Sequence, residues 1–292
     1  MRRSAGWFHP PAIGAAVVRR STLYGILVLG GATMLLPFAW MVATSLKEPA
    51  AVFSLSMRWW PTPIIWSHYR DIWRIPGIPF ARFFLNSVVV ALCVTVGHVV
   101  TSAWAAYAFA RLRFPGRDRL FFAYLTTMMI PGSVTMIPVF ILMKWFGWID
   151  TYRALIIPSL FSAYGTFLLQ QFFLSIPMDF EDAAKIDGAS AWRVFWQIMV
   201  PLSRPALATL TLFTFMGNWG SFMWPLLVVD SVEKKTLPIG LAYFQELYQY
   251  ASPHWPLLMA GSIVAMAPMV VLFLLNQRFF LEGIRLSPFR SE

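Results

Sequence analysis

Long apolar runs separated by short charged segments dominate the chain. Six runs contain no Asp, Glu, Lys or Arg, namely residues 21–46, 83–110, 120–143, 154–178, 205–229 and 247–277. Each exceeds the roughly 20 residues that a helix needs to cross a hydrocarbon core about 30 Å thick. A backbone in lipid must satisfy its own hydrogen bonds, and a run of this length does so as a helix. The pattern predicts an all-α integral membrane protein with six transmembrane helices.

Proline and tryptophan refine this picture. Pro37 predicts a kink in the first helix, and Pro131-Gly132 and Pro138 predict breaks in the third. The longest polar segment, residues 47–82, contains four tryptophans, which favour the membrane–water interface. This segment is expected to lie along the outer surface, and it is also a candidate docking face for an extracytoplasmic partner.

Basic residues gather on one side of the predicted membrane. With the N-terminus inside, the inner segments hold most of the 23 lysines and arginines: Arg2, Arg3, Arg19, Arg20, Arg111, Arg113, Arg117, Arg119, Lys185, Arg193, Arg204, Arg278, Arg285 and Arg290. This excess predicts that both termini are cytoplasmic. Residues 1–20 are predicted to be a basic cytoplasmic tail, and residues 21–292 a single transmembrane domain. The net charge of +10 is therefore a topology signal and not the footprint of a nucleic acid.

Composition supports the membrane interpretation. Hydrophobic residues make up 58% of the chain and charged residues 12%, whereas soluble domains have about 25% charged residues. The single cysteine, Cys93, lies inside an apolar run, so no internal disulfide can form. A secretory signal peptide has an apolar stretch of about 7–15 residues, and the first run is longer. This length favours a transmembrane helix that is not cleaved off.

A charged island between the fourth and fifth runs, residues 177–205, reads P-M-D-F-E-D-A-A-K-I-D-G-A-S-A-W-R-V-F-W-Q-I-M-V-P-L-S-R-P. Three carboxylates near its start favour a helix N-terminus, where the backbone carries partial positive charge. Asp187-Gly188 is a typical helix stop, because glycine adopts left-handed backbone angles without strain. Ser190 is a typical cap for a second helix, which Pro201 would end. The island is predicted to be a loop of two helices.

The order of residues in the island resembles the EAA loop of the permease subunits of ABC importers. That family's pattern is E-A-A, three residues, G, nine residues, I, one residue, L-P. It falls here on Asp182, Ala183, Ala184, Gly188, Ile198 and Pro201. Asp182 replaces the family's Glu, which keeps the charge but shortens its reach by one methylene, and Val200 replaces Leu. The alternative is an ordinary amphipathic loop with accidental spacing.

The resemblance implies that this loop couples the chain to a separate ATPase subunit. The residues that it assigns to coupling are Glu181, Asp182, Ala183, Ala184, Asp187, Gly188, Ile198 and Pro201. Three further segments show the same resemblance: A-A-Y-A-F-A-R-L-R-F-P-G-R at 105–117, M-I-P-G-S-V-T-M-I-P at 129–138, and T-L-P-I-G at 236–240. They point to the carbohydrate-uptake, maltose-type branch of these permeases.

Several partners follow from the resemblance. It implies a second, different permease subunit, two ATPase subunits that bind ATP and Mg²⁺, and an extracytoplasmic solute-binding protein that delivers a sugar. It also implies a multi-pass protein of a bacterial or archaeal cell membrane. This chain itself is expected to bind no cofactor or metal and to catalyse no reaction.

Polar residues inside the runs are candidates for the transport path. Asn218 lies near the centre of the fifth run between Gly217 and Gly220, with Trp219 beside it. Such an amide either bonds to a neighbouring helix or lines a path for a hydroxyl-rich solute. His98, near the middle of the second run, presents the same two alternatives, an interhelical hydrogen bond or the path.

Missing motifs narrow the function further. No G-x-x-x-x-G-K-[S/T] loop occurs, so the chain does not cradle ATP in the P-loop manner. The six runs contain no acidic residue, whereas carriers driven by protons or sodium usually use intramembrane acids. The sequence predicts the permease subunit of an ATP-driven importer that moves a sugar or oligosaccharide by alternating access. The alternatives are an importer for glycerol phosphate or a charged polysaccharide, or an ATP-independent carrier or channel.

Overall fold

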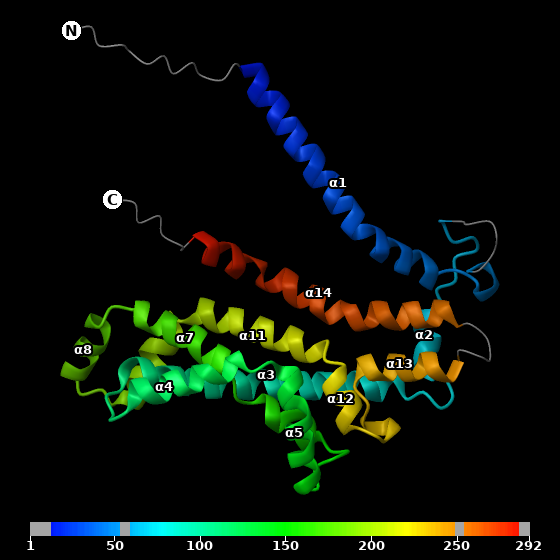
Figure 1. Ribbon diagram of the computed structural model, residues 1–292. Helices are drawn as coiled ribbons and strands as arrows, with labels where there is room; N and C mark the ends of the chain where they lie inside the picture. Colours follow the sequence, from blue (N-terminus) through cyan, green and yellow to red (C-terminus); the bar gives the residue numbers. More distant parts are fainter. Residues whose placement is uncertain (1–12, 53–58, 249–253, 286–292) are drawn as a thin grey trace.

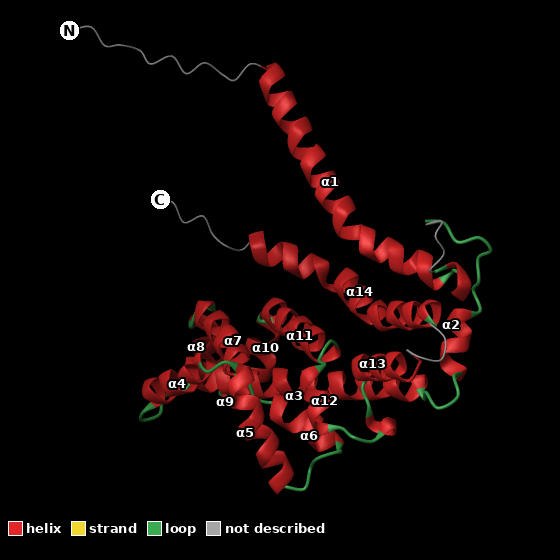
Figure 2. Ribbon diagram, turned by 45° about the vertical axis from the view of Figure 1, so that its right-hand side comes forward, coloured by secondary structure: helices red, strands yellow, loops and turns green. Residues whose placement is uncertain are grey.

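The computed structural model describes residues 13–52, 59–248 and 254–285, and throughout these ranges the regular elements are helices without strands (Figures 1 and 2). The helices are α1 (Ile13–Ser45), α2 (His68–Asp71), α3 (Phe80–Arg111), α4 (Arg117–Thr126), α5 (Gly132–Trp145), α6 (Tyr152–Ile156), α7 (Ala163–Ser175), α8 (Asp179–Ile186), α9 (Ala191–Val194), α10 (Val200–Leu202), α11 (Arg204–Trp219), α12 (Met223–Val228), α13 (Leu237–Tyr248) and α14 (Trp255–Arg285). The all-α prediction is confirmed for this part of the chain.

Four segments are long and apolar enough to span a membrane as they stand: Arg20–Ser45, Phe80–Arg111, Tyr152–Ser175 and Trp255–Leu275. Two bent pairs of helices raise the number to six if each pair is one span. Arg117–Met129 meets Gly132–Trp145 at 100°, and Ala191–Leu202 meets Arg204–Trp219 at 78°. The described residues therefore contain four to six candidate membrane spans.

Helix α3 lies at the centre and packs along α7 and α11, while α14 lies between α11 and α1 (Figure 1). The first half of α1 stands apart from the other helices in both ribbon views (Figures 1 and 2). The most apolar window of α1 buries none of its residues inside this chain. The helix begins at Ile13, so the second part of the predicted tail is helical, and residues 1–12 lie outside the described residues.

The core has clusters at the two ends of the bundle. We call these ends the α8 end and the α12 end. At the α8 end, buried side chains come from α3, α7, the 191–202 segment and α11: Ala103, Ala106, Tyr107, Ala110, Leu169, Phe173, Ile176, Val194, Phe195, Met199, Ala206 and Leu210. Towards the α12 end, α3 packs through Phe80 and Phe83 against α11, α13 and α14. Helix α3 thus contributes to the core along its whole length.

The helix breaks differ in part from the prediction. The third run does break at Pro131, but Pro138 lies inside α5, which continues through it because one missing N–H removes only a single helical hydrogen bond. The fourth run is interrupted around Pro158, between α6 and α7. Within the fifth run, α11 ends at Trp219 and α12 begins at Met223. The apolar runs therefore mark membrane segments, not single helices.

The last run was also placed too early. Its first residues belong to the end of α13, a separate helix, and α14 begins at Trp255. Uncharged composition alone cannot separate two apolar helices joined by a short connection.

The segment before α3 is more structured than the prediction of a surface loop. It contains α2, and His68 and Ile72 within it are buried. The imidazole Nδ1 of His68 lies 2.8 Å from the backbone oxygen of Ser45, at the end of α1. Its tryptophans Trp59, Trp60, Trp66 and Trp73 are nevertheless exposed. The segment is anchored by buried residues and still presents aromatic side chains outward.

Candidate functional sites: the coupling loop and the helix-break cleft

Local signals build α8 as the sequence predicts. Its first turn carries Asp179, Glu181 and Asp182 at the positive end of the helix. The helix closes with two hydrogen bonds, from Gly188 N to Lys185 O at 3.0 Å and from Ala189 N to Ala184 O at 2.9 Å. Gly188 has a φ of 77°, which is the left-handed residue that this closure requires.

The second helix of the loop differs from its predicted form. Ser190 does cap it, since its hydroxyl accepts a hydrogen bond from Arg193 N at 3.4 Å. The helix then widens into a π-helical turn, Phe195–Met199, and continues as α10 to Leu202. Pro201 therefore lies inside this helix and does not end it, because the π-helical turn shifts the hydrogen-bond register just before the proline.

A buried ion pair ties α8 to the transmembrane helices. Arg111 Nε lies 2.8 Å from Glu181 Oε1, and these side chains are only 4% and 2% exposed. The same guanidinium donates to the backbone oxygens of Phe173 at 2.6 Å and Ile176 at 2.5 Å, at the end of α7. Arg111 is the last residue of α3, so one side chain joins α3, α7 and α8.

The opposite side of α8 is exposed. The Asp182 side chain is 61% exposed, and among the described residues it pairs with Lys185, whose Nζ lies 3.2 Å from Asp182 Oδ1. Ile186 is 87% exposed and Phe180 52% exposed, which is unusual for large apolar side chains on so short a charged helix. Apolar groups beside a carboxylate on a protruding helix form a surface suited to another protein.

The predicted coupling residues divide into two sets. Glu181, Ala184, Ile198 and Pro201 face inward, with Glu181 buried and the other three partly buried. Asp182, Ala183, Asp187 and Gly188 are exposed. The residues that the sequence reasoning missed are Arg111, Phe180 and Ile186. The sequence does carry a signal for Ile186, because this isoleucine lies between Lys185 and Asp187 in a charged segment.

A second candidate site is a cleft of about 420 Å³ where three helix breaks meet. It is lined by Gly132, Thr135, Met136, Val139, Pro158, Ser159, Ser221, Phe222, Met223 and Trp224. These residues come from the first half of α5, the connection between α6 and α7, and the connection between α11 and α12 with the first two residues of α12. The lining offers hydroxyl groups and aromatic rings and contains no charged side chain.

His98 lies beside this region but makes an interhelical contact. Its Nδ1 lies 3.1 Å from the backbone oxygen of Ser159, in the break before α7. Its Nε2 packs against α7 at Gly165, where an added Cβ would come within 2.9 Å of it. The first of the two alternatives for His98, the interhelical hydrogen bond, is thus present, and a role in the path stays a prediction.

Asn218 and Trp219 are placed differently from each other. The Asn218 amide donates to Thr214 O at 2.8 Å, on its own helix, and within the described part of the chain it forms no hydrogen bond to a neighbouring helix. Trp219 is buried, and its indole N–H donates to Ala265 O of α14 at 2.8 Å. Its ring stacks on Phe215. Trp219 therefore packs α11 against α14, whereas Asn218, next to the break that lines the cleft, is the more accessible of the two.

Polar contacts fix the α12 end. Asp150, in the turn between α5 and α6, accepts hydrogen bonds from the Ser231 hydroxyl at 2.8 Å and from Lys234 Nζ at 2.8 Å. Burial alone would raise the pKa of Asp150, but the hydrogen bonds from Lys234, Ser231 and Asp230 outweigh it and hold the pKa at about 2. Asn86 of α3 donates to the backbone oxygens of Glu233 and Lys235 at 2.8 and 2.9 Å.

Among the described residues, no group of three or more His, Cys, Asp or Glu side chains is placed to hold a metal ion.

Residues 98–285 match the family described as the binding-protein-dependent transport system inner membrane component. The chain belongs to this family. It is therefore a permease subunit of an ABC transport system and a multi-pass component of the inner membrane. The matched residues include both candidate sites.

Known relatives agree with this assignment. The permease is 35% identical over 264 residues to the sn-glycerol-3-phosphate transport system permease protein UgpE of Yersinia pestis bv. Antiqua (strain Antiqua), a match that covers 89% of this chain and 93% of the relative. Two solved structures share its fold. A chain of a bacterial ABC transporter involved in the import of the acidic polysaccharide alginate has a TM-score of 0.79 at 24% identity, covering 94% of this chain and 100% of that chain. A chain of the bacterial alginate ABC transporter in complex with an alginate pentasaccharide-bound periplasmic protein has a TM-score of 0.63 at 14% identity, covering 90% and 95%.

Proposed function

We propose that this permease is the translocation subunit of an ATP-driven importer and that α8 docks on a separate ATPase subunit. The observation that carries the proposal is the two-sided α8: its inner side is fixed by the buried Arg111–Glu181 pair, while Asp182 and Ile186 project outward. A helix built in this way can transmit a displacement, because its partner holds one side and the membrane helices hold the other.

The topology that we propose has six spans with both termini in the cytoplasm. The two bent pairs each count as one span, and residues 1–20 are the cytoplasmic tail. The clustering of arginines around the start of α4 and the loop 177–205 supports a cytoplasmic α8 end. The exposed tryptophans before α3 then lie at the outer interface.

The proposed assembly contains a second, different permease, two ATPase subunits and an extracytoplasmic solute-binding protein. The unburied apolar window of α1 supports the second permease, because this helix stands apart from its own chain and can pack against a neighbouring one. ATP and Mg²⁺ are bound by the ATPase subunits, since this sequence has no P-loop.

The proposed mechanism is alternating access. Closure of the ATPase subunits on ATP carries α8 with them, and the buried pair passes the displacement to α3 and α7. These helices share the core at the α8 end with α11, so the loop and the bundle move together. The breaks that line the cleft are the points at which the spans can bend to open or close the path.

The solute that the cleft favours is a carbohydrate. Thr135, Ser159 and Ser221 offer hydroxyl groups, and Phe222 and Trp224 offer aromatic surface on which a sugar ring can pack. We propose this cleft, with the adjacent Asn218 and His98, as this subunit's share of the translocation path. Trp219 contributes by holding α11 in place.

Glycerol phosphate is the second candidate solute, favoured by the 35% identical permease of a glycerol-3-phosphate system. A phosphate group needs a cationic partner, and the cleft lining has none. Recognition of the phosphate would then fall to the second permease or to the binding protein.

The test uses the permease reconstituted in liposomes with its partner subunits. Ile186→Asp should abolish solute-stimulated ATP hydrolysis and uptake together, because a carboxylate cannot be buried against the ATPase. Gln197→Asp, which adds the same charge at an exposed position of the second loop helix, is the matched control and should retain both. Uptake that persists without any ATPase subunit would refute the proposal and favour an ATP-independent carrier or channel.

A further inference from the structure

The outer side of the second helix of the coupling loop carries large aromatic side chains. This helix runs through its π-helical turn from Ala191 to Leu202 and is called the second loop helix below. Trp192 and Trp196 are exposed on it, and their ring centroids lie 5.7 Å apart. The exposed Trp104 of α3 continues this surface, because its ring lies 6.1 Å from that of Trp192. These three tryptophans form what we call the tryptophan surface.

The opposite side of the second loop helix is fixed to the bundle. Val194, Phe195 and Met199 are buried in the core at the α8 end. The Phe195 ring lies 5.2 Å from the ring of Tyr107 in α3. Because one side of the helix is buried in this way, its tryptophans are held facing away from the core.

The second loop helix lies across the direction of the span that follows it. It meets Arg204–Trp219 at an angle of 78°. In the proposed topology, on which this orientation rests, the bent pair contributes one span, and that span contains α11. Membrane spans have a typical tilt of about 20° from the membrane normal. The second loop helix therefore lies nearly in the plane of the membrane.

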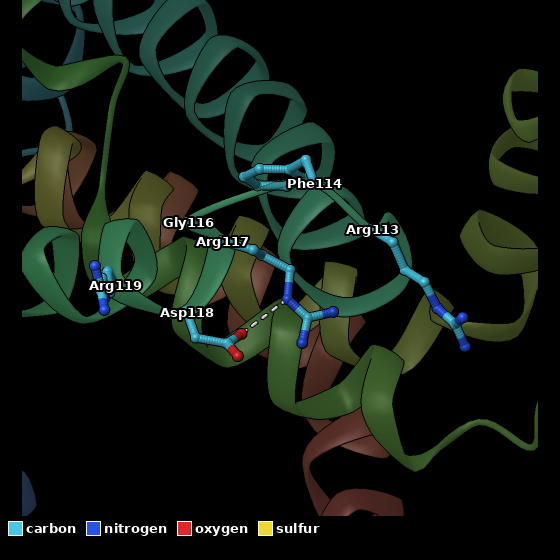
Figure 3. Close-up of a pocket in the computed structure, with 6 residues that line it drawn as sticks. All are labelled: Arg113, Phe114, Gly116, Arg117, Asp118 and Arg119. Carbon is cyan, nitrogen blue, oxygen red and sulfur yellow. Dashed lines mark hydrogen bonds and ion pairs between the residues drawn. The ribbon is translucent and has the colours of Figure 1, made fainter.

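The turn between α3 and α4 marks the membrane surface at the α8 end. It carries Arg113, Arg117 and Arg119, and basic residues next to a span are typical of the headgroup layer. Figure 3 shows Arg113 and Arg119 on opposite sides of the Arg117–Asp118 pair. These arginines spread positive charge around the turn and do not converge on one ligand.

The position of Trp104 along α3 gives the depth of the tryptophan surface. Trp104 precedes the last residue of α3, Arg111, by about 10 Å at a rise of about 1.5 Å per residue. The interfacial layer on each side of the hydrocarbon core is about 5–7 Å thick. Trp104 and the neighbouring Trp192 therefore lie where this layer meets the hydrocarbon, and tryptophan is enriched at the membrane–water interface.

Charge separates the two helices of the coupling loop. Helix α8 carries three acidic residues and one lysine. Residues 191–204 contain no acidic residue, and Arg193 and Arg204 are both exposed. A membrane surface that contains anionic lipids attracts the basic segment and repels the acidic one.

We propose that the tryptophan surface contacts the lipid interface at the α8 end. The second loop helix then lies on the membrane, with Arg193 and Arg204 near the headgroups, while α8 faces away from the membrane towards the ATPase subunit. The membrane keeps the second loop helix at a constant depth while α8 moves with the ATPase.

The test measures the depth of spin labels in the complete transporter, assembled with cysteine-free partner subunits in nanodiscs of phosphatidylglycerol and phosphatidylethanolamine. The labels are attached to Trp192→Cys or Trp196→Cys in a Cys93→Ser background, which removes the one native thiol of this chain. Electron paramagnetic resonance compares how often each label collides with oxygen, which concentrates in lipid, and with a water-soluble nickel chelate. Both labels should collide more often with oxygen, with and without the ATPase subunits.

The matched control is Asp179→Cys in the same background, at an exposed position of α8. Without the ATPase subunits, its label should collide more often with the nickel chelate, because α8 faces away from the membrane. More frequent collision with nickel at positions 192 and 196 would overturn the proposal.

Shielding of positions 192 and 196 from both reagents would also overturn the proposal. If the shielding required the ATPase subunits, the tryptophan surface would be a contact with them, and if it persisted without them, a contact with the second permease. Docking of α8 is tested separately by Ile186→Asp, so the lipid contact can fail while the proposed function stands.

Discussion

Two neighbouring carboxylates in α8 should separate the stability of the permease from its coupling. Glu181 is 2% exposed and pairs with Arg111, whereas Asp182 is 61% exposed and pairs with Lys185, which is itself exposed. We therefore expect Glu181→Ala to destabilise the fold and Asp182→Ala to leave it almost unchanged. The two substitutions remove the same charge one residue apart, so each is the control for the other.

The magnitude follows from what each change leaves behind. Removing one partner of a buried ion pair costs about 3–5 kcal/mol, because the remaining charge stays buried without compensation. Arg111 keeps its contacts with the backbone oxygens of Phe173 and Ile176, which favours the lower end, about 3 kcal/mol. An exposed pair such as Asp182–Lys185 contributes about 0–1 kcal/mol.

The assay is equilibrium unfolding in mixed micelles, followed by circular dichroism, together with ATP hydrolysis in the reconstituted complex. Glu181→Ala should lower the free energy of unfolding, and Asp182→Ala should instead weaken the response of hydrolysis to solute. The combined Arg111→Met, Glu181→Leu variant should cost less than the sum of its single changes, because both buried charges are then absent. Equal destabilisation by Glu181→Ala and Asp182→Ala would refute the reasoning.

Four further substitutions test other parts of the structure by their effect on the free energy of unfolding. Asp150→Ala should lower the free energy of unfolding by about 1 kcal/mol at pH 7. In the folded protein the pKa of Asp150 is about 2, below its ordinary value of 3.8. The difference in free energy between the variant and the wild type should therefore vanish as the pH falls from about 4 to 2. Gly240→Ala should cost about 1–3 kcal/mol, since its Cβ would overlap the buried ring of Phe83. Gly217→Ala, with open space around it, should be neutral or stabilising in the same unfolding assay. Gly188→Ala should cost about 1–2 kcal/mol, because alanine is strained in the left-handed backbone conformation of residue 188. An unchanged midpoint of the unfolding transition would exclude that strain.

Much of the coupling loop could be predicted from its sequence because its signals are local. The acidic first turn of α8, the glycine that closes it and the serine that caps the next helix all act within a few residues. Each appears in the structure where the sequence places it. The exception is Pro201, where a π-helical turn several residues earlier changes the hydrogen-bond register. That turn has no residue signature of its own.

The packing of the loop could not be predicted, because it depends on residues distant in sequence. Arg111 was interpreted only as a charge at the membrane boundary, yet it meets Glu181, 70 residues later, in the buried core. The division of the predicted coupling residues into inward and outward sets follows from this contact. Likewise, the cleft combines three helix breaks from different spans, and no single stretch of sequence shows that they converge.

Three polar side chains of α3 share one role that their positions in the sequence do not show. Arg111 binds the backbone oxygens at the end of α7, His98 lies against the backbone oxygen of Ser159 in the break before α7, and Asn86 binds those of Glu233 and Lys235 before α13. Backbone oxygens at helix ends lack intrahelical partners, and lipid offers none. The polar residues of one continuous span therefore satisfy the interrupted helices around it. A polar residue in a membrane segment can therefore indicate an interrupted neighbouring helix as well as a transport path. His98 is best interpreted first as a partner of the interrupted helix before α7.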